Sequence, residues 1–206
     1  IIKLKEEKEN KMRILIIATM RSGGYYFTKS LSDTYQLQFI HEPKYKKEFD
    51  KLASLDNVCI KLYLEQLTKY YNKETNINKV DRIQAICSHI RKLNFDKVFI
   101  LDRRNSTEHV EACISMVYHL KNMKIRWNAN DKEFKTIRDR EWSKMSLFLK
   151  KVSAVLDEIS AELGITKIYY EDLYYNTEVV DLQGLEFKPD TSKKLRLDLD
   201  DKLPLI

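Results

Sequence analysis

Short apolar runs alternate with amphipathic stretches along most of the 206-residue chain. Strands are expected at 13–18, 37–43, 57–64 and 96–102, and a last strand with its exit at 166–173. The run at 13–18 is continuous and β-branched, which is typical of a strand buried on both faces, and the run at 96–102 is interpreted in the same way. Between the expected strands, apolar residues three and four apart predict helices over 80–93, 110–120 and about 143–163. A helix is also expected after the glycine turn at 23–24, to about residue 34, and Asn105 with Glu108 marks the start of the helix over 110–120. The alternation predicts an α/β fold: a central, mostly parallel sheet with helices on both faces.

The composition indicates one globular domain. Hydrophobic residues make up 43% of the chain and charged residues 33%, and we find no repeat or linker. We expect residues 1–12 to be a charged N-terminal extension, with Met12 as a candidate natural start, and 13–206 to be a single domain. The net charge of +6 suits a phosphate-bearing partner. The cations are interspersed with acids, which argues against a nucleic-acid binder.

The cysteines and the apolar runs bear on the compartment. Cys59, Cys87 and Cys113 lie far apart without metal-ligand spacing, so we predict buried thiols in a reducing compartment and no metal site. The apolar run 14–20 is too short to span a bilayer and lacks a secretory cleavage pattern. We therefore expect a cytoplasmic protein without a membrane span.

The segment "TMRSGGYYFTKSL", residues 19–31, holds two of the four glycines in the chain. It connects the first predicted strand to the first predicted helix. A strand, a glycine turn and a helix N-terminus together aim backbone N–H groups at one point, where a phosphate is the usual ligand. The alternative is a tight turn that binds nothing.

One known phosphate loop fits this segment poorly. From Gly23 to Ser30 the spacing matches G-x-x-x-x-G-K-[ST], except that Thr28 replaces the second glycine. Bulky residues fill the arc that would curl round a nucleoside triphosphate. We therefore predict that Lys29 and Ser30 already lie on the helix, and a small nucleotide kinase is a weaker alternative.

Another phosphate loop fits better. "MRSGGYY" resembles the 5′-phosphosulfate loop of the sulfotransferases, P-[RK]-S-G-[STG]-[ST]-[WYL], whose donor is 3′-phosphoadenosine 5′-phosphosulfate (PAPS). Met20 stands in place of the proline, and Tyr25 in place of a hydroxyl residue. The resemblance implies that Arg21 meets the 5′-phosphate and that the donor is lined by Ser22, Gly23, Gly24, Tyr25 and Tyr26.

A second resemblance lies in "VFILDRRNSTEHVEACIS". In the sulfotransferases a strand ends in Arg-Asn, and a serine eight residues after the arginine helps it to bind the 3′-phosphate. Arg104 and Asn105 match that pattern, but Ala112 stands at the serine position. Ser115, almost one helical turn further, is the candidate substitute.

A third segment, "KIYYEDL", resembles the Y-E-D-L segment that closes the sheet in many sulfotransferases, which implies no catalytic role for residues 170–173. The three elements occur in the family's order across residues 13–187. Together they imply a three-layer P-loop-type fold and a sulfotransferase-like domain.

Three further residues are candidates for catalysis. Related sulfotransferases place a glutamate base after the second strand, which implies Glu42, with His41 as the second choice. Because Pro43 follows, we expect Glu42 in an extended conformation. Lys61 stands where related enzymes place a strand lysine near the transferred group, although it could instead reach the surface.

The remaining polar side chains have simpler interpretations. His89 and His119 are interpreted as surface or hydrogen-bonded histidines. The tyrosine pairs at 70–71 and 174–175 are candidates for an acceptor site, although packing in the core or at an interface explains them better.

The sequence thus predicts sulfuryl transfer from PAPS to a hydroxyl or amine acceptor, with 3′,5′-ADP as product and no metal. The acceptor is a sugar, a lipid, a phenol or a protein, and its pocket is expected from loops 65–79 and 122–140. A catalytically decayed, non-enzymatic nucleotide-binding protein of the same fold is the alternative that Tyr25 and Ala112 favour.

Overall fold

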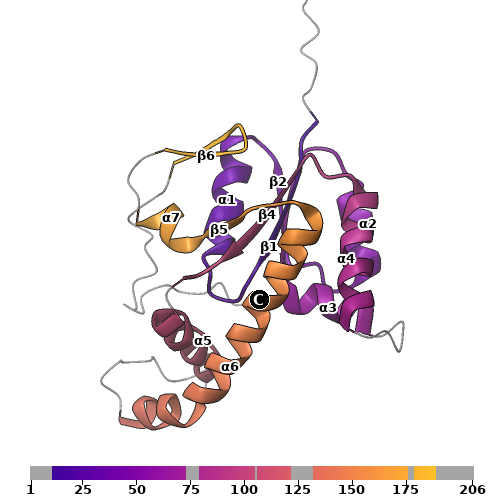
Figure 1. Ribbon diagram of the computed structural model, residues 1–206. Helices are drawn as coiled ribbons and strands as arrows, with labels where there is room; N and C mark the ends of the chain where they lie inside the picture. Colours follow the sequence, from indigo (N-terminus) through magenta and orange to yellow (C-terminus); the bar gives the residue numbers. More distant parts are fainter. Residues whose placement is uncertain (1–10, 73–78, 105, 122–131, 176–178, 189–206) are drawn as a thin grey trace, which may run out of the picture.

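The computed structural model describes residues 11–72, 79–104, 106–121, 132–175 and 179–188. Five parallel strands form a sheet in the order β2-β3-β1-β4-β5, with β1 (Arg13–Ala18) at its centre (Figure 1). The other strands are β2 (Gln38–His41), β3 (Val58–Tyr63), β4 (Lys97–Asp102) and β5 (Lys167–Tyr169). This confirms the predicted α/β fold with a parallel central sheet.

The alternation of side chains along β1 divides the core into two layers. Ile14, Ile16 and Ala18 face the cluster built with α1 (Gly24–Thr34) and α7 (Tyr170–Tyr174). Leu15 and Ile17 face the opposite cluster, which includes residues of α4 (Lys79–Leu93) and α6 (Lys132–Leu163). Because both faces are covered, the central strand is apolar and buried from Ile14 to Ala18, as the sequence predicts.

Several elements differ from the prediction. The short helices α2 (Lys46–Ala53) and α3 (Leu64–Asn72) and the hairpin of β6 (Val180–Leu182) and β7 (Leu185–Phe187) were not predicted. Helix α6 begins at Lys132 rather than at 143. The last predicted strand gives only the three residues of β5 before the chain turns into α7. Elements this short carry too few apolar repeats to be read from periodicity.

Helix α5 (Ser106–Lys121) packs against the first half of α6, below the sheet in the view of Figure 1. Val110, Cys113, Ile114 and Leu149 form a small core there, and Met20 from the loop after β1 packs against it. The loop after β1 is therefore held between α5 and the sheet. Cys59, Cys87 and Cys113 are all buried thiols, as predicted. No helix in the described ranges is long and apolar enough to cross a membrane.

Candidate functional site

The loop 19–23 leaves the carboxyl end of the central strand and leads into α1. Gly23 caps the helix with φ 77°, and the Phe27 N–H donates to the Gly23 carbonyl at 3.1 Å. The earlier N–H groups of the first turn have no acceptor within the helix. The loop therefore has the strand, turn and helix N-terminus that the sequence predicts, in the position where open α/β sheets bind ligands.

Both glycines are required by close contacts. A Cβ atom on Gly23 would lie 2.7 Å from the Tyr170 ring, in addition to the strain of its positive φ. A Cβ atom on Gly24 would lie 3.0 Å from the Ala18 Cβ and 3.3 Å from the Lys61 Cε. The glycines thus let α1 begin directly against the sheet and directly over Lys61.

Hydrogen bonds within the loop fix its shape. The Ser22 hydroxyl donates to the Thr19 carbonyl at 2.7 Å, and the Thr19 N–H donates to the Leu101 carbonyl at 3.1 Å. Ser22 is buried. Its hydroxyl closes the turn rather than facing the solvent, so its predicted contribution to the donor site reduces to its backbone.

Arg21 is the strained residue of this loop. Its φ is 57°, a left-handed conformation that costs about 1–3 kcal/mol for a residue other than glycine. The guanidinium Nε is buried and has no hydrogen-bond partner within the described residues. Burial raises the pKa of both Tyr63 and Cys113, and the Arg21 charge opposes that rise. The guanidinium therefore lies at the carboxyl edge of the sheet with an unused donor.

His41, Glu42 and Lys61 meet beside this loop. The Lys61 Nζ lies 2.5 Å from the Glu42 Oε1 and 3.4 Å from the His41 Nε2, and the His41 Nε2 lies 2.9 Å from the Glu42 Oε1. The structure thus brings all three predicted catalytic residues together. Lys61 does not reach the surface: it is fully buried, and its Nζ lies 3.1 Å from the centre of the Tyr63 ring.

The protonation of this cluster follows from burial and pairing. Burial alone would raise the pKa of Glu42, but hydrogen bonds and charge from His41 and Lys61 lower it to about 2. Burial lowers the pKa of Lys61 to about 8, although Glu42 acts in the opposite direction. Glu42 is therefore ionised at neutral pH and is a weak proton acceptor.

The backbone of Glu42 is not extended, so the expectation based on Pro43 was wrong. Its φ is 54°, and the Glu42 N–H donates to the Lys61 carbonyl at 3.0 Å. That hydrogen bond continues the pairing of β2 with β3 by one residue and turns the carboxylate back toward Lys61. Tertiary pairing here overrides the local preference of a residue before proline.

The two tyrosines of the loop motif pack inward. The Tyr25 ring makes edge-to-face contacts with Tyr26, Phe39 and His41, at centroid distances of 5.4, 5.3 and 5.2 Å. Tyr26 packs at the margin of the cluster under α1. The Tyr25 side chain therefore packs against Phe39 and His41 of β2, and only its backbone is suited to a bound phosphate.

Arg104 contacts residues of β5 and α7. Its guanidinium is 54% exposed, forms an ion pair with Asp172 and lies 4.2 Å from the centre of the Tyr169 ring. Ala112 is buried and Ser115 is half-buried, both on α5. Within the described part of the chain no hydrogen bond joins Arg104 to Ser115, so a joint role at a 3′-phosphate stays a prediction.

Sequence reasoning missed the neighbouring arginine. The Arg103 side chain is 3% exposed, pairs with Glu108 at 2.9 Å and lies 4.6 Å from the centre of the Tyr170 ring. Tyr170 is the residue that packs against Gly23, so Arg103 buttresses the loop from β4. One signal in the sequence could have indicated this. Successive side chains of an extended chain point to opposite faces, so one of the two consecutive arginines after β4 was expected to point inward.

His109 and Cys113 on α5 were also missed as supports of the loop. The His109 Nε2 donates to the Met20 carbonyl at 2.6 Å, and the Cys113 thiol lies 3.7 Å from the same oxygen. Burial lowers the pKa of His109, which keeps the ring neutral. These contacts tie the residue before Arg21 to α5.

The remaining predictions concern the other candidates. Lys29 and Ser30 lie on α1, as predicted, and Lys29 is exposed and paired with Asp33, which leaves the kinase-loop interpretation without support. The His89 Nε2 lies 2.7 Å from the Asp50 Oδ1, and burial lowers the pKa of this histidine. Tyr70, Tyr71 and Tyr174 are buried packing residues.

His119 and most of 122–140 lie outside the residues whose side chains the structure describes. In the other segment that was expected to be a loop, 65–79, residues up to 72 belong to the helix α3.

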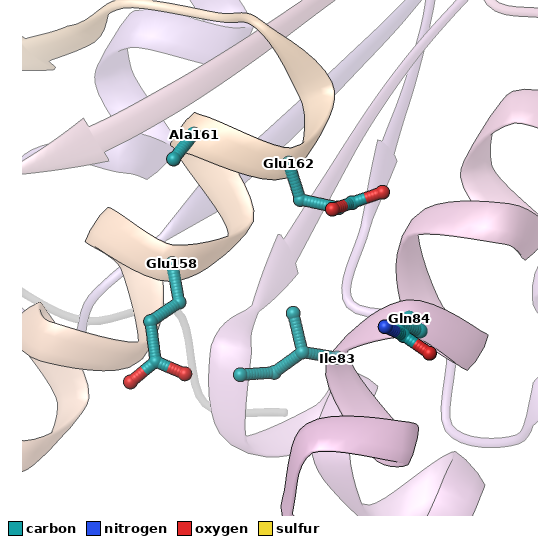
Figure 2. Close-up of a pocket in the computed structure, with 5 residues that line it drawn as sticks. All are labelled: Ile83, Gln84, Glu158, Ala161 and Glu162. Atoms are coloured by element: carbon teal, nitrogen blue, oxygen red, sulfur yellow. The ribbon is translucent and has the colours of Figure 1, made fainter.

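A surface hollow of about 410 Å³ lies elsewhere, between α4 and α6 (Figure 2). It is lined by Ile83, Gln84, Glu158, Ala161 and Glu162, whose side chains come from two neighbouring helices. It contains none of the predicted site residues. In the described part of the chain, no group of three or more histidine, cysteine or acidic residues is placed to hold a metal ion.

Comparisons with known proteins add little. No family model and no curated protein matches the sequence. Among solved structures, the chain is similar to the YorR protein of Bacillus subtilis in complex with phosphorylated GDP, with 13% identity and a TM-score of 0.40 over 75% of this chain and 83% of that one. Because a TM-score this low supports no argument about the site, the function must be inferred from the site's own residues.

Proposed function

We propose that the protein is a sulfotransferase that takes the sulfuryl group from PAPS. The observation that carries this proposal is the junction of two features at one edge of the sheet. One is the loop with the unpaired Arg21 Nε, and the other is the buried cluster of Lys61, Glu42 and His41 beside Gly24. The first fits the 5′-phosphate that leaves, and the second fits the group that is transferred.

The residues fit such a donor on physical grounds. The buried Nε of Arg21 lacks an acceptor, and a phosphate oxygen would supply one in a charge-assisted hydrogen bond. A side chain at Gly24 would fill the space over Lys61, so the glycine keeps that space open. The N–H groups of the first turn of α1 add to the anion site.

Each residue has a role in the transfer. PAPS supplies an activated sulfuryl group that is joined to the 5′-phosphate. Arg21 and the loop amides stabilise the charge that grows on that phosphate as the bond to sulfur breaks. Lys61 neutralises the oxygens around sulfur, and Glu42 and His41 hold the ammonium in place. Catalysis of this kind depends on positioning and charge, as in phosphoryl transfer.

The 3′-phosphate is assigned to Arg104, with Ser115 on α5 as the second contact. The exposed ion pair of Arg104 with Asp172 is worth about 0–1 kcal/mol, so a phosphate can displace it. A test is the comparison of 3′,5′-ADP with 5′-AMP on Arg104→Ala, in which only 3′,5′-ADP should bind less tightly. Ala112→Ser should tighten 3′,5′-ADP if Ser115 does not already serve.

The proposal is tested by thermal shifts with 3′,5′-ADP, PAPS, ATP and GTP. At 100 times its dissociation constant, 3′,5′-ADP should stabilise the protein by about 2.7 kcal/mol. ATP and GTP should stabilise it far less, because the loop lacks the second glycine of a triphosphate cradle. An equal or larger shift with ATP would reject the sulfotransferase.

A non-catalytic nucleotide-binding protein of the same fold is the second candidate. One observation favours it: the pKa of Glu42 is lowered to about 2, which makes the predicted base a poor one. In that case 3′,5′-ADP binds, but no sulfate is released from PAPS. The two candidate functions therefore predict the same binding of 3′,5′-ADP, but only the sulfotransferase predicts the turnover of PAPS.

A further inference from the structure

Glu65 stands out among the acidic residues that the sequence analysis did not use. It is the second residue of α3, directly after β3. Both of its carboxyl oxygens are buried, and neither accepts a hydrogen bond from another residue in the described part of the chain. A buried polar group without a partner costs about 1–3 kcal/mol, and more when it is charged. A group kept at that cost is a candidate for contact with a ligand.

The start of α3 fixes where Glu65 lies. The Gln66 side-chain oxygen accepts the Tyr63 N–H at 2.9 Å, which resembles half of a capping box. The helix therefore begins immediately after the strand, and Glu65 falls at the carboxyl edge of the sheet. This is the same edge from which Glu42 and the Arg21 loop emerge.

The charges around Glu65 belong to the proposed site. Burial raises the pKa of Glu65, and its own backbone N–H and the charges of Lys61 and Lys69 oppose the rise, whereas Glu42 adds to it. Glu65 in turn adds to the raised pKa of Tyr63 and of Cys113, the two groups that also experience the Arg21 charge. Glu65, on α3, and Arg21, in the loop after β1, thus act on the same two side chains with opposite charge.

The two carboxylates of the site are engaged differently. Glu42 is held by Lys61 at 2.5 Å and by His41 at 2.9 Å, so it has little capacity left to accept a proton. Glu65 has no such partner. We propose that Glu65 is the catalytic base of the transfer and that Glu42 is a positioning residue for Lys61. This inference rests on the proposed sulfotransferase function.

The acceptor oxygen forms a bond to sulfur, while the bond between sulfur and the 5′-phosphate oxygen breaks and its electron pair stays on the phosphate. The acceptor's proton passes to the Glu65 carboxylate and then to water. The products are the sulfate ester and 3′,5′-ADP. No oxidant, reductant or metal is needed.

The first test uses water as the smallest hydroxyl acceptor and measures sulfate release from PAPS by the full chain. Glu65→Gln should lower the rate by about 10²–10⁴-fold, the usual contribution of a general base, and leave the affinity for 3′,5′-ADP within about twofold. Glu186→Gln, an exposed carboxylate on β7, is the matched control and should change neither.

The pH profile separates a base from a merely structural residue. The parent rate should rise with pH through one ionisation above the ordinary glutamate pKa, because the base must be ionised. The Glu65→Gln variant should lose that rise. A variant that retains the parent rate within a few-fold, or that keeps the rise with pH, would overturn the assignment.

Stability gives a second measurement that needs no donor. A carboxyl whose pKa is raised in the folded state binds its proton more tightly there, so stability falls as pH rises from the unfolded value toward the folded value. Glu65→Gln should remove that part of the fall and be more stable than the parent at pH 7. Equal pH dependence in both proteins would contradict the buried, unpaired carboxyl.

The outcomes for the two proposals are distinct. If 3′,5′-ADP does not bind the parent, the proposed function fails, and the base falls with it. If 3′,5′-ADP binds and the parent releases no sulfate above the uncatalysed rate, the base assignment is overturned while nucleotide binding stands.

Discussion

A buried lysine lies on each side of the central strand, and the pKa values of these two lysines are shifted in opposite directions. On the β4–β5 side, the Lys167 Nζ lies 2.9 Å from Asp102, 2.8 Å from Asp157 and 3.2 Å from the Ser153 hydroxyl. Those partners raise its pKa although burial acts to lower it. On the β2–β3 side, burial lowers the pKa of Lys61 to about 8 despite its contact with Glu42.

The difference extends to the neighbours of each lysine. Asp102 accepts hydrogen bonds from Lys167, from Ser153, from the Thr19 hydroxyl and from the Arg103 backbone, so its capacity is used. The Arg21 Nε, in the loop after the central strand, and the Glu65 carboxyl, in the helix after β3, have no such partners in the described chain. Completed networks stabilise the fold, whereas incomplete ones remain available to a ligand.

The largest expected effect is on the completed side. Lys167→Met leaves the carboxylate of Asp102, which is 2% exposed, without its cation, and should cost about 3–5 kcal/mol of unfolding free energy. Lys61→Met should cost on the order of 1 kcal/mol or less, because it removes a poorly solvated ammonium. Glu42 is 24% exposed and keeps His41.

Urea denaturation at pH 7 measures both values, with 3′,5′-ADP binding as the check on folding. Equal losses in the two variants would show that Lys61 stabilises the fold as much as Lys167 does, and the comparison between the sides would fail.

The next effect concerns Gly23, in the loop that connects the central strand to α1. Gly23→Ala should destabilise the protein by about 2–4 kcal/mol, because its Cβ would lie 2.7 Å from the Tyr170 ring at a φ of 77°. Gly164→Ala is the matched control, since its φ is 69° and nothing lies within 4 Å of the added atom. It should cost about 1 kcal/mol.

The difference between the two alanine variants isolates the contact with Tyr170, and thermal unfolding measures it. If both variants lose the same stability, then α7 moves away from the loop without cost, and Arg103 cannot be supporting the loop through Tyr170.

A smaller effect, on the affinity for 3′,5′-ADP, distinguishes Arg21 from Arg104. Arg21→Gly removes the guanidinium and relieves the left-handed backbone, so stability should be equal or slightly higher. Affinity for 3′,5′-ADP should fall by the worth of a charge-assisted contact, about 1.5–3 kcal/mol. Arg104→Gln, on an exposed pair, should lose less affinity and leave binding of 5′-AMP unchanged.

Titration calorimetry with both nucleotides gives the affinities. A loss of stability in Arg21→Gly would mean that the guanidinium holds the loop together, in which case its role is structural.

The sheet was predictable, whereas the details of its carboxyl edge were not. The run "ILIIA" of β1 has no polar residue, and that alone places it at the centre of a covered sheet. The choice between Arg103 and Arg104 depends on Tyr170 and Asp172, which reach these arginines from α7. Spacing within one segment contains no information about such distant partners.

The role of Glu65 could not be predicted from the sequence either. In the sequence it is one of 31 acidic residues and follows a strand, as many exposed glutamates do. Its burial depends on α3, a nine-residue helix that begins without an interval after β3. The absence of partners around a side chain is a property of three-dimensional packing and has no counterpart in a motif.

The smallest expected effect is a pH dependence that the two lysines impart with opposite sign. The pKa of Lys61 in the folded state is about 8, below the ordinary 10.5, so the unfolded chain binds more protons between these values. Stability therefore rises with pH in that window. The pKa of Lys167 is raised, so its stabilisation is complete below pH 10.5 and is lost only above that pH.

Between pH 7.5 and 9.5 the unfolding free energy of the parent should rise by about 1–2 kcal/mol because of Lys61, a rise that Lys61→Met lacks and Lys167→Met retains. Urea midpoints across that range measure it, and a rise that survives in Lys61→Met would assign the titration to another group and leave Lys61 fully charged at the site.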